Sequence, residues 1–136
     1  MIQKIGHLAF YTRDMEKALD FYCGVLGFQE AFTLDDEHGK PWIHYLLLPG
    51  GQFLELFYGN PTPAENCAYA HLCLEVEDIQ ATAAHMRENN IPLDIEPNQG
   101  ADLNWQCWIK DPDGNRIEFM QISPGSPQAK ARRQAK

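Results

Sequence analysis

Apolar and polar residues alternate along this chain in two successive blocks of the same design. In the first block, strand-like runs cover residues 4–11, 28–34, 42–48 and 52–58, and apolar residues recur at helical spacing between 14 and 27. Asp14 is a suitable N-cap for this helix, and Gly27 is a suitable residue to end it. The order of the pattern predicts a β-α-β-β-β unit.

The second block repeats that order. A strand at 69–76 precedes a helix that Asp78 caps, and strands follow near 92–96, 105–109 and 116–121. The sequence Asp-Pro-Asp-Gly at 111–114 is typical of a tight turn between the last two strands. We therefore expect an α+β fold of two βαβββ modules whose curved mixed sheets form a cleft. The predicted parts are a module at 1–58, a linker at 59–68, a module at 69–122 and a flexible basic tail at 123–136.

A histidine and a glutamate recur at matching positions of the two modules. His7 and His71 lie in the first strand of each module, and Glu55 and Glu118 lie in the last. Because side chains alternate along a strand, the apolar neighbours of these four residues point to the opposite face, where a helix would cover them. Each residue alone could be an ordinary side chain on an exposed sheet. Their repetition on one predicted face favours a shared site.

Two imidazoles and two carboxylates suit one divalent ion such as Ni²⁺, Zn²⁺, Co²⁺, Mn²⁺ or Fe²⁺. Four protein ligands leave two positions of an octahedron open, which indicates catalysis rather than a structural role. Such an ion can hold two neighbouring oxygens of a substrate and stabilise a metal-bound enediolate, while a carboxylate carries the proton.

The paired units, the four candidate ligands and the ending DPDGNRIEF resemble the vicinal oxygen chelate superfamily, and glyoxalase I (lactoylglutathione lyase) in particular, over residues 1–122. The resemblance implies the glyoxalase/bleomycin resistance/dioxygenase fold, one divalent metal per site and a small-molecule substrate. For glyoxalase I in particular, the implied substrate is the glutathione hemithioacetal of methylglyoxal. The resemblance further implies that Glu118 is the principal base, that Glu55 is a second catalytic carboxylate, and that the protein forms a homodimer.

Three further residues are candidates for substrate binding by the same resemblance. Tyr11 stands four residues after His7, where related glyoxalases carry an arginine that binds a glutathione carboxylate; Arg13 has the same strand parity but lies two residues further on. Asn60 lies five residues after Glu55, whereas relatives place their asparagine four residues after the equivalent glutamate. Tyr11 cannot form the two parallel, charged hydrogen bonds that an arginine donates to a carboxylate. The sequence therefore leaves open which thiol forms part of the substrate.

Other functions remain alternatives from the sequence. The nearest is another isomerase or epimerase of the superfamily with the same ligands. An Fe(II) extradiol dioxygenase would use His7, His71 and Glu118 and would leave Glu55 without a role. A metal-free drug-binding resistance protein would have no need of the four ligands.

Composition narrows the classes of partner. The chain has 136 residues, enough for one compact domain, and its net charge of −8 argues against nucleic acid. No apolar run approaches the length of a membrane span or a signal peptide, so we expect a cytoplasmic protein that does not bind membranes. The four cysteines form no CxxC pair and are expected to be reduced and mostly buried.

Overall fold

The computed structural model describes residues 5–60 and 69–134. The chain divides into two compact units, Met1–Cys67 and Ala68–Lys136. Most of the predicted linker, the first four residues and the end of the predicted tail lie outside the described residues. No helix in the described part of the chain is long and apolar enough to cross a membrane.

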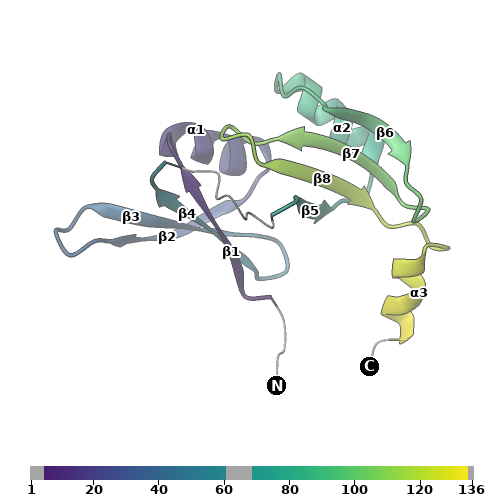
Figure 1. Ribbon diagram of the computed structural model, residues 1–136, viewed down its shortest axis with the longest axis horizontal. Helices are drawn as coiled ribbons and strands as arrows, with labels where there is room; N and C mark the ends of the chain where they lie inside the picture. Colours follow the sequence, from purple (N-terminus) through teal and green to yellow (C-terminus); the bar gives the residue numbers. More distant parts are fainter. Residues whose placement is uncertain (1–4, 61–68, 135–136) are drawn as a thin grey trace. The chain divides into compact units, whose positions relative to one another are not determined.

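Each unit contains one βαβββ module, as the sequence pattern predicts (Figure 1). Module one runs β1 (His7–Thr12), α1 (Met15–Leu19), the π-helix η1 (Asp20–Val25), β2 (Gln29–Asp35), β3 (Pro41–Leu47) and β4 (Phe53–Tyr58). Module two runs β5 (Leu72–Glu75), α2 (Ile79–Glu88), β6 (Ile95–Gln99), β7 (Trp105–Lys110) and β8 (Arg116–Gln121), and α3 (Pro127–Gln134) follows it.

The two sheets have the same topology. Their strand orders are β1-β4-β3-β2 and β5-β8-β7-β6, so the first strand of each module lies at an edge of its sheet and pairs in parallel with the last strand of that module. The strand that contains His7 therefore lies beside the strand of Glu55, and the strand that begins directly after His71 lies beside the strand of Glu118. The predicted fold class is confirmed.

Equivalent aspartates begin the two module helices. The carboxylate of Asp14 accepts a hydrogen bond from the amide of Lys17 at 3.1 Å, and that of Asp78 accepts from Gln80 and Ala81 at 2.8 and 2.9 Å. Gly27 has a φ of 74°, which fits its predicted place after the helix. The second half of the first helix differs from the prediction because it is a π-helix, and a helical spacing of apolar residues cannot distinguish i−4 from i−5 hydrogen bonding.

The core of module two lies between α2 and one face of its sheet. Ile79, Ala83 and Met86 of α2 are buried, as are Ile117 and Phe119 of β8. Burying an isoleucine, methionine or phenylalanine side chain contributes about 1.5–3 kcal/mol to stability. Glu118 lies between Ile117 and Phe119 in β8, so its side chain faces away from α2.

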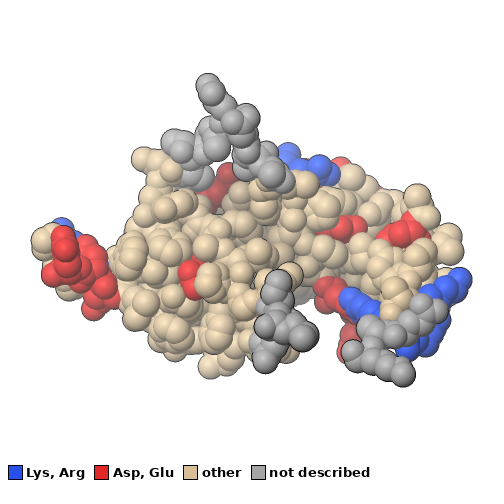
Figure 2. Space-filling view, turned by 60° about the horizontal axis from the view of Figure 1, so that its bottom comes forward, with Lys and Arg blue, Asp and Glu red and all other residues tan. Residues whose placement is uncertain are grey.

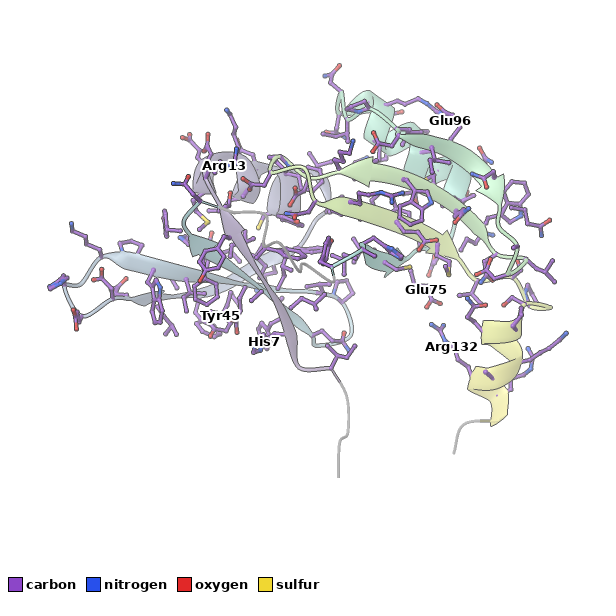
Figure 3. The ribbon with its side chains drawn as sticks, viewed as in Figure 1. His7, Arg13, Tyr45, Glu75, Glu96 and Arg132 are labelled. Carbon is purple, nitrogen blue, oxygen red and sulfur yellow. The ribbon has the colours of Figure 1, made fainter. Side chains whose placement is uncertain are left out.

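Further differences from the sequence prediction concern one strand of module two and the C-terminal tail. The strand expected near 92–96 is observed at Ile95–Gln99, with a register irregularity in the edge strand around Pro97, which has no N–H for the ladder. A helix, α3, forms where a flexible tail was expected. The side-chain amide of Gln128 donates to Asp102 at 2.8 Å, and Arg132 pairs with Glu75 at 2.7 Å (Figure 3), so α3 is attached to module two.

The charged side chains are unevenly distributed. Figure 2 shows one group of blue side chains over α3, and red side chains at the β2–β3 hairpin. Lys130, Arg132 and Arg133 of the predicted tail are therefore carried on a helix.

Candidate metal centre

Glu55 lies in β4, an inner strand of module one, with Ala9 of β1 on one side and Tyr45 of β3 on the other. His7 is two residues before Ala9 and therefore shares its face. His7 Nδ1 lies 3.2 Å from Glu55 Oε1. The structure thus brings together the predicted pair of module one.

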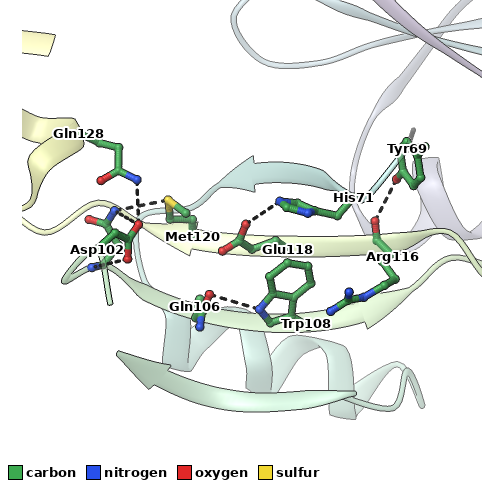
Figure 4. A network of polar contacts seen from close by, with 10 residues as sticks. Tyr69, His71, Asp102, Gln106, Trp108, Arg116, Glu118, Met120 and Gln128 are labelled. Carbon is green, nitrogen blue, oxygen red and sulfur yellow. Dashed lines mark hydrogen bonds and ion pairs between the residues drawn. The ribbon is translucent and has the colours of Figure 1, made fainter. Parts of the chain in front are cut away.

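Module two repeats this arrangement. Glu118 lies between Cys73 of β5 and Trp108 of β7, and His71 immediately precedes β5. His71 Nε2 lies 3.1 Å from Glu118 Oε2 (Figure 4). The structure therefore also brings together the predicted pair of module two.

The carboxylates of both pairs are buried, and the imidazoles are more accessible. The side chains of Glu55 and Glu118 are 7% and 6% exposed, whereas those of His7 and His71 are 55% and 34% exposed. A buried carboxylate is costly unless a hydrogen-bond donor or a cation compensates it. Each glutamate therefore depends on the partners that its sheet provides.

The two glutamates have different further partners. Partial desolvation raises the pKa of Tyr45, and a hydrogen bond to Glu55 and the charge of that carboxylate raise it further. The Cys73 thiol is solvent-accessible by surface area, yet desolvation by its surroundings, together with the charge of Glu118 and a hydrogen bond to it, raises its pKa to about 12. A tyrosine hydroxyl thus contacts one carboxylate and a protonated thiol the other.

The donor atoms of each pair fit one divalent ion. Two ligands about 2.1 Å from a metal and at right angles to each other are about 3 Å apart, close to the two distances observed. Imidazole nitrogen and carboxylate oxygen are donors that borderline divalent ions accept. Each unit contains one imidazole and one carboxylate of the predicted donor set. Within the described residues the structure forms no group of three or more potential metal ligands.

Aromatic rings surround Glu55 on its face of the first sheet. Tyr45 stacks on Phe32 with ring centroids 4.3 Å apart, and the centroid of Phe53 lies 6.1 Å from that of Tyr45. Phe57, two residues after Glu55, contacts Tyr11 at 5.6 Å. This face is suited to hold an apolar or planar part of a ligand.

The three predicted substrate-binding residues lie at one end of module one. Tyr11 is exposed in β1 and contacts Phe57. Arg13 lies in the bend after β1 has ended, so its predicted strand parity does not apply (Figure 3). Asn60 is exposed beyond the end of β4.

His44 lies on the opposite face of β3 from Tyr45. Its Nδ1 lies 2.6 Å from Glu30 and its Nε2 lies 3.2 Å from the hydroxyl of Tyr58. This buried histidine therefore belongs to a separate polar network, away from Glu55.

Comparisons with known proteins agree with this architecture. A family model described as the Glyoxalase/Bleomycin resistance protein/Dioxygenase superfamily matches residues 4–119. Lactoylglutathione lyase of Pseudomonas putida is 28% identical and covers 88% of this chain and 85% of its own length. The uncharacterized protein YaeR of Escherichia coli K12 is 27% identical, with 88% and 97% covered. The crystal structure of TnmS3, an antibiotic binding protein from Streptomyces sp. CB03234, has a TM-score of 0.71 at 25% identity and covers 90% of this chain and 98% of that one.

Proposed function

This chain belongs to the glyoxalase/bleomycin resistance protein/dioxygenase superfamily, and on that premise we propose that it is a metal-dependent lyase or isomerase. Its proposed substrate is a thiohemiacetal or a related α-hydroxycarbonyl compound, with a methylglyoxal–glutathione adduct as the first candidate. The relatives named lactoylglutathione lyase support this choice, because they match nearly the whole chain.

The observation that carries the proposal is the repeated His–Glu pair. Its donor atoms are 3.2 Å apart in module one and 3.1 Å apart in module two, at equivalent places in two sheets of the same topology. We propose that His7, Glu55, His71 and Glu118 together hold one divalent ion. When bound, the ion would supply the positive charge that polarises a substrate carbonyl.

The proposed role of Glu118 is that of a general base. Its carboxylate would take the proton from the carbon next to the carbonyl, leaving an enediolate, and return the proton to the neighbouring carbon. The hydrogen is moved within the substrate, so no external oxidant or reductant is required. His71 is placed to keep Glu118 oriented, because its ring lies within hydrogen-bond distance of the carboxylate. Glu55 would be the second catalytic carboxylate.

Metal analysis tests the donor set directly. Purified protein should contain one divalent ion per site, and His7→Ala should lose it. Glu55→Ala should also lose metal, whereas Glu75→Gln, a carboxylate of β5 outside the pairs, should retain it. Unchanged metal in Glu55→Ala would instead favour the three-ligand set of a dioxygenase.

A metal-free binding protein is the second candidate function. TnmS3, which is described as an antibiotic binding protein, supports it, as does the stacked pair of Phe32 and Tyr45 beside Glu55. Protein that contains no metal after purification, takes up no added Ni²⁺ or Zn²⁺, and binds a planar aromatic compound would establish this alternative.

We include a homodimer in the proposal, with each site completed within one chain or by two chains. Co-expression of His7→Ala with Glu118→Gln distinguishes the two arrangements. If modules of different chains share a site, one site of the mixed dimer keeps all four ligands and activity returns. If each site lies within one chain, both sites of the mixed dimer are defective.

A further inference from the structure

Arg116 lies on the same face of β8 as Glu118, two residues before it. In the β7–β8 ladder Trp108 is directly opposite Glu118, and Lys110 is directly opposite Arg116. Alternation along the strands therefore places all four side chains on the face that α2 does not cover. A cation is thus available about 6.5 Å along the strand from the proposed base.

The guanidinium of Arg116 is held over an aromatic ring. Its central carbon lies 4.5 Å from the centroid of Trp108, which is the geometry of a cation–π contact (Figure 4). The ring of Trp108 in turn contacts His71, with centroids 4.7 Å apart. The proposed metal ligand, the indole and the guanidinium are therefore consecutive contacts on one surface.

Several hydrogen bonds fix this arrangement. The indole N–H of Trp108 donates to Gln106 at 3.3 Å, and the amide of Gln106 donates to Asn98 at 3.2 Å. The hydroxyl of Tyr69 donates to the backbone carbonyl of Arg116 at 3.0 Å. Both the ring and the strand end that carries the arginine are thus positioned without a ligand.

Among the residues that the structure describes, Arg116 forms no ion pair with an acid. By contrast, Lys110 pairs with Asp94 at 3.2 Å and Arg132 pairs with Glu75. A guanidinium keeps its charge at any physiological pH and binds a carboxylate through two parallel N–H bonds. Its exposed edge can therefore accept an anionic ligand.

We propose that Arg116, supported by Trp108, binds a carboxylate of the substrate, so that the site prefers α-hydroxycarbonyl adducts that carry an acid group. This inference rests on the proposed function, because it places the carboxylate beside the His71–Glu118 pair. It adds a specificity-determining residue that does not coordinate metal.

Binding of unreactive probes tests the inference independently of catalysis. The probes are S-methylglutathione and S-methylmercaptoacetate, each compared with its ethyl ester by calorimetry on the purified, metal-loaded protein. We expect the wild-type protein to bind at least one acid about 10- to 100-fold more tightly than its ester. Which of the two acids shows this preference identifies the size of the thiol part.

Arg116→Gln should abolish the preference for the acid and leave binding of the ester unchanged. Arg116→Lys keeps the positive charge but loses the two parallel N–H donors of the guanidinium, so it should retain part of the preference for the acid. Lys110→Gln is the matched control. It removes a cation that lies directly opposite Arg116 but already pairs with Asp94, so this variant should keep the full preference for the acid. Metal content should be unchanged in all three variants.

Two results would overturn the inference. One is a wild-type protein that binds neither acid more tightly than its ester, and the other is an Arg116→Gln variant that keeps the preference while melting at the wild-type temperature. A wild-type protein that prefers the acid but does not turn over the methylglyoxal–glutathione adduct would count against the proposed chemistry alone. The two proposals can therefore fail separately.

Discussion

Tyr45 lies directly across the β3–β4 ladder from Glu55 and hydrogen-bonds to its carboxylate. The equivalent position opposite Glu118 holds Trp108, whose N–H donates to Gln106 instead. The Tyr45 hydroxyl therefore helps to orient the carboxylate of Glu55, whereas the residue across the ladder from Glu118 bonds to a different side chain.

Tyr45→Phe removes the hydroxyl and keeps the ring that stacks on Phe32. We expect metal affinity to fall about tenfold, because the loss of a hydrogen bond to a ligand typically weakens a metal site by that order. Competition with a chromogenic chelator measures the change. Tyr58→Phe, which removes a hydroxyl from the separate His44 network, should leave metal affinity unchanged; equal losses in both variants would contradict the assigned role of Tyr45.

Glu118→Gln keeps the shape of the side chain and removes the proposed base. Turnover of the methylglyoxal–glutathione adduct should fall by a factor on the order of 10² to 10⁴, the usual contribution of general base catalysis. Initial rates at saturating metal measure this effect, with Glu75→Gln as the control on the same face of module two. A Glu118→Gln variant with full activity would disprove the base assignment.

Strand alternation, visible in the sequence, accounts for much of this site. It predicted the shared face of His7 and Glu55, and the same rule would have indicated Cys73 and Arg116, which have the parity of His71 and Glu118. It could not place Tyr45 or Trp108 opposite the glutamates, because that depends on the register of two hairpins.

The C-terminal helix was not predictable in the same way. Residues 127–134 contain almost no large apolar side chain, so they lack the periodic signal of a packed helix. The helix is supported instead by Ser126, whose hydroxyl accepts from the amide of Ala129 at 3.1 Å, and by the contacts of Gln128 and Arg132 with module two. Side-chain hydrogen bonds between distant residues leave no periodic pattern in a single sequence.

The contact between Cys73 and Glu118 predicts a change in thiol reactivity. Glu118 contributes to the raised pKa of Cys73, so Glu118→Gln should lower that pKa and increase the thiolate fraction. Iodoacetamide labelling of metal-free protein at pH 8.5, followed by peptide mass spectrometry, should show faster modification of Cys73. Glu96→Gln, which is not a neighbour of this thiol, should not change its rate; an unchanged rate in Glu118→Gln would argue against the contact.

Cys107 makes the free energy of unfolding dependent on alkaline pH. It is fully buried in β7, and desolvation, followed by the charge of Glu96, raises its pKa from the ordinary value of 9.0 to about 11. The unfolded chain releases this proton near pH 9, whereas the folded chain keeps it to about pH 11. The stabilising contribution is therefore complete below pH 9 and is lost as the pH rises from 9 to 11. Urea unfolding across this range should give a steeper loss of stability for the wild-type protein than for Cys107→Ala, and parallel pH profiles would show that the thiol is not protected from ionisation in the folded state.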